Sequence, residues 1–136
     1  MIPETIDQII TKLHNKTKNG EANWHKTGRS SEFVLKMKSG SILVDVFEDE
    51  HGNDIADISI QNEDGDRVDY YRVNDSFDND QHHEGYEKLK NLYDEIYRKY
   101  YKIEETLKGL LKEIDSDSII GEEIIDEDTS DDDLPF

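Results

Sequence analysis

The chain has 136 residues, of which 33% are hydrophobic and 37% are charged, and it has a net charge of −18. These values predict one domain with a small core, followed by an appendage. Cysteine is absent, which excludes disulfides, cysteine-based zinc sites and thiol nucleophiles and suits a reducing cytosol.

The acidic charge is concentrated at the C-terminal end. Residues 115–136 contain ten acidic residues and no Lys or Arg, whereas residues 1–114 contain the other 24 acidic residues and all 16 bases. An acidic block of this kind repels itself and is typical of an interaction tail. Nucleic-acid binding depends on clustered Lys and Arg, so the sequence disfavours direct nucleic-acid binding by the body.

Residues 2–18 predict an N-terminal helix. Pro3 suits the first helical turn, and Asn19-Gly20 is a typical end signal. Apolar residues recur between them at helical spacing: Ile6, Ile9, Ile10 and Leu13. No signal peptide is evident, and no apolar run approaches the ~18 residues of a membrane span. We therefore expect a soluble, cytoplasmic protein that does not bind membranes.

Residues 22–73 predict four short strands joined by tight turns. Turn residues such as Ser39-Gly40 and Asp64-Gly65 separate runs in which apolar and polar residues alternate. The residues that mark the four runs are Phe33, Leu35 and Met37; Ile42, Val44 and Val46; Ala56, Ile58 and Ile60; and Val68, Tyr70 and Arg72. Trp24 belongs either to a further short strand or to the entry loop. The pattern predicts an antiparallel meander with one apolar face.

Residues 84–114 have the periodicity of a long helix, preceded by a polar loop with Asp80 as a candidate N-cap. Unbroken, this helix would be roughly 46 Å long, well beyond the ~17–20 Å of a typical strand. It therefore either bends near residues 100–102 and folds back, or projects and pairs with another copy. The predicted fold class is α+β: an N-terminal helix, a four-stranded antiparallel meander and a long C-terminal helix. In terms of domains, we expect an α+β domain over residues 1–114 and a disordered acidic tail over residues 115–136.

The sequence offers little support for catalysis or metal binding. The Asp-rich turns do not match the ligand spacing of an EF-hand loop, and the adjacent His82 and His83 would point ~100° apart on a helix. There is neither a nucleophile elbow nor a phosphate-binding glycine loop. We therefore predict no catalytic residues, no metal, no cofactor and no enzymatic activity.

The tyrosine-rich helix suggests a second kind of surface. Tyrosines at this spacing could stack nucleic-acid bases, but the neighbouring lysines and arginine are offset by acidic residues. A homodimer face fits better, and its predicted members are Tyr93, Tyr97, Tyr100, Ile103 and Leu107.

The acidic tail finishes in an apolar group that a solubilising tail does not require. Asp131, Asp132 and Asp133 precede Leu134, Pro135 and Phe136. The phenylalanine ring can fill a partner's pocket, its α-carboxylate can pair with an arginine, and the prolyl ring reduces the entropy lost on docking. The aspartates attract a basic rim, so binding should weaken with salt.

These last residues resemble the C-terminal tip of bacterial single-stranded DNA-binding protein, especially the tips of low-GC Gram-positive bacteria. The resemblance covers about nine residues, 128–136. The body lacks the basic groove of that family's OB-fold and the usual Gly/Gln/Pro-rich linker, so the resemblance implies only the docking role, carried by residues 131–136. The implied partners are RecQ-type and PriA-type helicases, RecO, RecG and RecJ-like nucleases.

The sequence therefore predicts a non-enzymatic adaptor or decoy for such replication, recombination or repair enzymes, encoded by a phage or mobile element. An alternative is an acidic DNA mimic that inhibits a DNA-binding or defence protein. A third reading is self-regulation, in which Phe136 docks on a basic patch of its own body.

Overall fold

A computed structural model of the chain describes residues 2–75 and 80–122, and for residues 80–83 it describes the backbone only. The chain divides into two units, Met1–Glu104 and Glu105–Phe136. The helices are α1 (Glu4–Lys18), α2 (Asp80–Tyr100) and α3 (Ile103–Ile114), and the strands are β1 (His25–Lys26), β2 (Glu32–Lys36), β3 (Gly40–Glu48), β4 (Asp54–Asn62) and β5 (Arg67–Asn74). No helix in the described ranges is long and apolar enough to cross a membrane.

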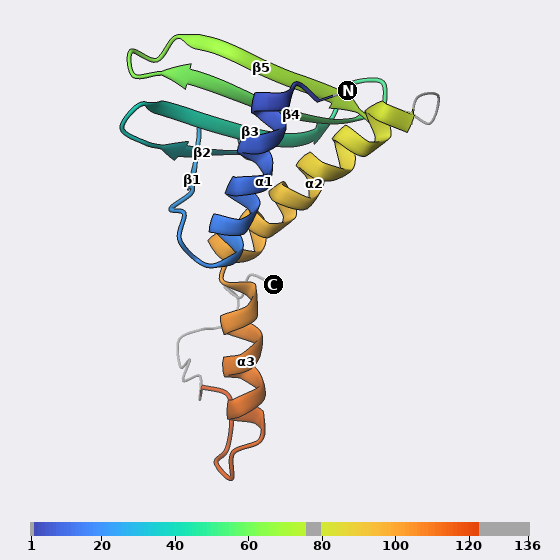
Figure 1. The fold of residues 1–136 in the computed structure, drawn as a ribbon. Helices are drawn as coiled ribbons and strands as arrows, with labels where there is room; N and C mark the ends of the chain where they lie inside the picture. The colour runs from blue at the N-terminus through green and yellow to red at the C-terminus, as the bar shows by residue number, and fades with distance from the viewer. Residues whose placement is uncertain (1, 76–79, 123–136) are drawn as a thin grey trace, which may run out of the picture. The chain divides into compact units, whose positions relative to one another are not determined.

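The strands form one antiparallel sheet in the order β1-β2-β3-β4-β5, so each strand pairs with its neighbours in sequence (Figure 1). Val44 lies at its centre, opposite Phe33 on β2 and Ile58 on β4. The predicted α+β class and antiparallel meander are confirmed. The predicted count of four strands is wrong by one, because β1 has only two residues and is too short to produce an alternating pattern.

The core lies between one face of this sheet and the two helices of the same unit, α1 and α2 (Figure 1). Antiparallel sheets commonly bury one face in this way. Ile6, Ile10 and Leu13 of α1 are buried, in keeping with the predicted amphipathic pattern. The largest fully buried side chains are Phe33, Ile6, Ile10, Ile58, Leu89, Leu92 and Ile96. The Trp24 indole N–H donates a hydrogen bond of 3.0 Å to the Thr17 hydroxyl beside this core.

Side chains within two sheet turns stabilise those turns. In the β3–β4 turn, one carboxylate oxygen of Asp49 accepts the backbone N–H groups of His51 and Asn53, at 2.9 and 2.8 Å. In the β4–β5 turn, the amide oxygen of Asn62 accepts those of Asp64 and Asp66, at 2.9 and 3.0 Å. Asx residues favour turns for this reason, so these polar residues have a local structural role.

The long C-terminal helix is interrupted at residues 101–102. A bend near residues 100–102 was one of the two alternatives that the sequence predicted. Helix α2 ends at Tyr100 and α3 begins at Ile103. Lys102 between them has a φ of 54°, a left-handed conformation that is unusual for a residue other than glycine. Arg98 and Glu104 form an ion pair across the break.

A close approach occurs where α2 crosses β5. Gly85 of α2 lies against Tyr71 of β5, and a Cβ atom at this glycine would overlap the tyrosine hydroxyl. That hydroxyl is buried and makes no hydrogen bond within the described residues. Burial raises the pKa of Tyr71, and nearby Glu84 raises it further.

Candidate functional site

The residues predicted to bind a partner lie outside the part of the chain that the structure describes, which ends at Glu122. They are Asp131, Asp132, Asp133, Leu134, Pro135 and Phe136. The described residues present three further surfaces whose side chains could bind a ligand or partner. They are a tyrosine cluster, a groove between α1 and α2, and the sheet face opposite the helices.

The residues of the predicted dimer face have different environments. Tyr93 is only partly exposed: its ring lies 5.5 Å from that of Phe33, and its hydroxyl donates a 2.7 Å hydrogen bond to the Ser31 carbonyl. Burial raises the pKa of Tyr93 to about 12. Tyr97 and Tyr100 are exposed, as is Leu107 on α3.

Tyr97 and Tyr100 form a cluster with Tyr101 at the end of α2. The Tyr101 ring lies 4.7 Å from that of Tyr97 and 4.9 Å from that of Tyr100. The Lys26 ammonium group lies 5.6 Å from the centre of the Tyr101 ring, close enough for a cation–π contact. Exposed tyrosines beside a cation can bind a partner's aromatic or acidic groups. The sequence pattern identified the tyrosines but not Lys26, which is far from them in sequence and is brought there by β1.

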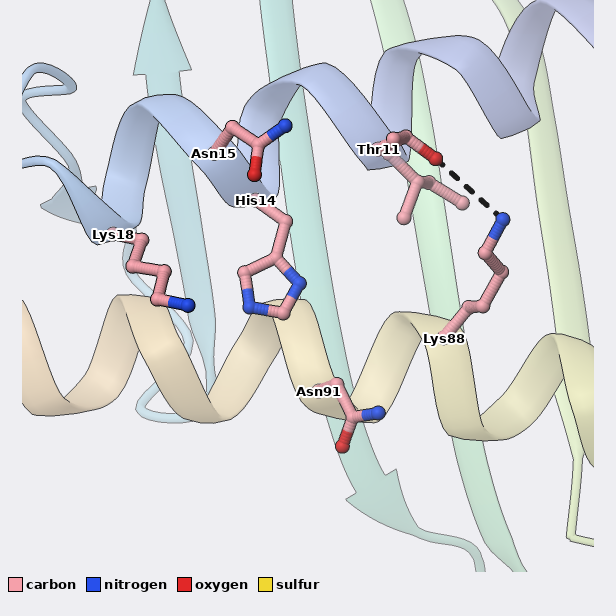
Figure 2. Close-up of a pocket in the computed structure, with 7 residues that line it drawn as sticks. Thr11, His14, Asn15, Lys18, Lys88 and Asn91 are labelled. Carbon is pink, nitrogen blue, oxygen red and sulfur yellow. Dashed lines mark hydrogen bonds between the residues drawn. The ribbon is translucent and has the colours of Figure 1, made fainter.

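A groove of about 260 Å³ runs between α1 and α2 and is lined by Ile10, Thr11, His14, Asn15, Lys18, Lys88 and Asn91. Figure 2 shows His14 and Lys18 extending from α1 toward α2, and Lys88 extending from α2 toward Thr11. Lys88 donates to the Thr11 hydroxyl at 3.5 Å and forms an ion pair with Asp7. His14 lies 3.9 Å from Glu95. Lys88 therefore links the two helices through contacts within the chain.

The open face of the sheet carries two buried carboxylates directly opposite each other, Asp45 on β3 and Asp57 on β4. Arg29, from the loop before β2, lies 2.8 Å from Asp45, whose side chain is only 1% exposed. The contact is ionic, since its geometry does not make either Asp45 oxygen a hydrogen-bond acceptor. Arg72 donates two hydrogen bonds to Asp57, of 3.2 and 2.8 Å.

Phe47 completes this arrangement. The Arg29 and Arg72 guanidinium groups lie 5.3 and 5.6 Å from the centre of its ring. The sequence assigned no functional role to these four charged residues, and Arg72 only marked the last predicted strand. Only the register of β3 and β4 brings the two carboxylates together.

Asp57 and Asp49 should respond to pH in opposite directions. Burial raises the pKa of Asp57, although the Arg72 hydrogen bond opposes the shift. The contribution of Asp57 to stability therefore falls as pH rises through a window above 3.8. The Asn53 backbone N–H lowers the pKa of Asp49, so its contribution is lost as pH falls through a window below 3.8. The free energy of unfolding of Asp57→Asn, measured in urea relative to wild type, should therefore be higher at pH 7 than at pH 3. For Asp49→Asn, the free energy of unfolding relative to wild type should be lower at pH 7 than at pH 3. If the values for both variants changed in the same direction with pH, this assignment would be contradicted.

Comparison of the chain with models of known protein families, with curated proteins and with solved structures found no match. Among the described residues, no group of three or more His, Asp or Glu could hold a metal ion. The function must therefore be inferred from the residues themselves.

Proposed function

We propose that the protein is a non-enzymatic adaptor or decoy that presents residues 131–136 to enzymes that dock on the tip of bacterial single-stranded DNA-binding protein. The observation that carries the proposal is the sequence Asp-Asp-Asp-Leu-Pro-Phe at these positions. The proposed partners are RecQ-type and PriA-type helicases, RecO, RecG and RecJ-like nucleases. A protein encoded by a phage or mobile element could use such a peptide to recruit these enzymes or to occupy their docking site.

The chemistry of binding follows from the residue types. The Phe136 ring enters an apolar pocket while its free α-carboxylate pairs with an arginine of the partner. Leu134 adds apolar contact, and Pro135 limits the conformations lost on binding. Asp131, Asp132 and Asp133 accelerate association with a basic rim, and salt screens that attraction.

The charge of the body supports an adaptor role over direct DNA binding. Residues 1–114 contain 24 acidic residues against 16 Lys and Arg. Arg29 and Arg72 are paired with Asp45 and Asp57. The same pairs weigh against the DNA-mimic alternative at this face, since a mimic needs carboxylates that are free to imitate phosphates.

The proposal is tested by measuring the affinity of the full chain for a purified RecQ-type helicase and for RecO. Deletion of Phe136 should weaken binding at least about tenfold, because anchor residues of this kind dominate small interfaces. A glycine added after Phe136 should have a similar effect, since it moves the carboxylate away from the ring. Ile124→Ala, an apolar truncation in the same acidic tail but outside the motif, is the matched control and should bind like wild type.

Unchanged affinity after deletion of Phe136 would overturn the proposal. If that variant still bound a DNA-binding protein and competed with DNA for it, the mimic alternative would be favoured instead. Wild-type binding should weaken as salt is increased, and salt-independent binding would contradict the proposed role of the three aspartates.

A further inference from the structure

Helix α3 has an apolar face that is largely uncovered within the described residues, with only Ile103 at its start partly buried. The helix has 12 residues, and none of them is buried. Leu107, Leu110, Leu111 and Ile114 are between 50% and 61% exposed. Isolated helices of this length are marginal in water, and α3 also carries Gly109 in its interior, which lowers helix propensity further. A covering partner would therefore stabilise α3 as well as bury its apolar face.

The spacing of the apolar residues identifies the kind of partner. Ile103, Leu107, Leu110 and Ile114 are separated by four, three and four positions, so both the spacing and the residue types read the same from either end. Alternating steps of three and four residues form the apolar seam along which helices pair. A palindromic seam matches a second copy of itself when the two helices run antiparallel.

We propose that α3 is a self-association helix, which pairs antiparallel with α3 of a second copy of this chain. Ile103 of each helix packs on Ile114 of the other, and Leu107 of each packs on Leu110 of the other, which gives four apolar layers. The arrangement has the two-fold symmetry of most homodimers, in which the same patch serves on both subunits. Leu111 lies beside the seam and extends the apolar contact.

The charges of α3 also fit a second copy better than a charged partner. The seam itself is uncharged, and the helix carries Glu104, Glu105 and Glu113 with Lys108 and Lys112. Its near-neutral balance contrasts with the acidic charge of the chain as a whole. Self-association should therefore strengthen with salt, which screens repulsion between two acidic molecules, in contrast to the salt-weakened binding expected for the tip.

The available contact area predicts a weak dimer. Each helix offers only a few apolar side chains that are 50–61% exposed, an area well below the ~1,600 Å² of a standard stable interface. Assembly should therefore depend on protein concentration. The inference does not require the proposed function, but it would extend it: a dimer presents two copies of residues 131–136 and raises their effective concentration at a multivalent target.

Disulfide trapping tests the orientation in the full chain, which contains no native cysteine. We expect that an oxidised mixture of Ile103→Cys and Ile114→Cys proteins, distinguished by tags of different length, will form the mixed disulfide. Ile114→Cys alone should form little, because the two equivalent positions of an antiparallel pair lie about 16 Å apart, beyond the ~7 Å between Cα atoms that a disulfide spans. Efficient self-crosslinking of Ile114→Cys would overturn the antiparallel arrangement.

Sedimentation equilibrium tests the association itself. Leu107→Lys should raise the dimer dissociation constant at least about tenfold, because it places a charge in the seam. Lys112→Glu, a charge change on the polar side of the same helix, should alter it less than about threefold. Circular dichroism should show that both variants retain the fold of the body, since α3 contributes no buried residue. A chain that remains monomeric at all concentrations and salt levels would overturn the proposal.

Discussion

Replacing Arg29 with alanine should lower the free energy of unfolding by about 3 kcal/mol, because it leaves a buried carboxylate without its ionic partner. Asp45 is 1% exposed, and Arg29 lies 2.8 Å from it. We place the effect at the lower end of the usual range because Arg29 is itself 56% exposed, so water can partly fill its position. Urea unfolding at neutral pH, followed by circular dichroism, measures the change.

A second substitution separates this mechanism from a general loss of packing. Asp45→Asn removes the buried charge, so Arg29→Ala should cost much less in that background than in the wild type. The matched control is Arg67→Ala, since Arg67 also contacts an aromatic ring, that of Tyr70 at 4.4 Å. It should change stability by less than about 1 kcal/mol. If Asp45→Asn did not reduce the effect of Arg29→Ala, the ion pair would not be its cause.

Tyr71→Phe should raise the free energy of unfolding by about 1 kcal/mol, because it removes a buried hydroxyl that has no hydrogen-bond partner among the described residues. The same substitution should change the response to Gly85→Ala. In the wild type, the alanine Cβ overlaps the tyrosine hydroxyl, and overpacking of this kind costs about 1–3 kcal/mol. In the Tyr71→Phe background the overlap with the hydroxyl is gone and only a tight contact of 3.2 Å with the ring carbon Cζ remains, so the alanine should be better tolerated.

The double-mutant cycle isolates this contact. We expect a coupling of about 1–2 kcal/mol between positions 71 and 85, in the direction that favours the double variant. Gly109→Ala is the control for helix propensity alone, since a Cβ at Gly109 meets no atom within 4 Å. Additive effects of Tyr71→Phe and Gly85→Ala would contradict the proposed overlap.

The sequence predicted the elements whose residue pattern matches their burial. Ile42, Val44, Ala56 and Ile58 occupy alternate positions of β3 and β4, and all four are buried in the core. The same alternation fails at Met37, which is 51% exposed, and in β5, where Val68 and Tyr70 are 59% and 52% exposed whereas Val73 is buried. Strand β2 ends at Lys36, opposite Ser41, and Met37 belongs to the turn. Alternation alone does not show where a hairpin turn begins.

The predicted long helix shows a second limit of periodicity. Its apolar spacing continues from α2 into α3, although Lys102 interrupts the helix with a left-handed backbone. Periodicity therefore described which face is apolar, whereas the break lies near residues 100–102, where a bend was one of the two predicted alternatives. Length was the informative signal, because an unbroken helix would have been longer than the strands it covers.

The charged groups of the sheet could not be predicted from local sequence. Arg29 stands in a loop and Asp45 in a strand, and each suits an exposed position. Their pairing depends on how the loop folds over the sheet, which is a tertiary property. Residues 131–136 differ from these groups, because they are informative as a linear motif without reference to the fold. Their docking role stays a prediction that binding measurements must test.

The order of the elements also has a consequence for biosynthesis. Neighbouring strands of the meander are joined by short turns, so their contacts are local and can form rapidly. Helix α1 is synthesised first, yet it packs against α2, and its ion pair between Asp7 and Lys88 joins residues 81 positions apart. Ile6, Ile10 and Leu13 therefore lack part of their final cover until most of the chain has left the ribosome. We expect the docking of α1 with α2 to be a late step of folding, during which this apolar surface is most vulnerable to aggregation.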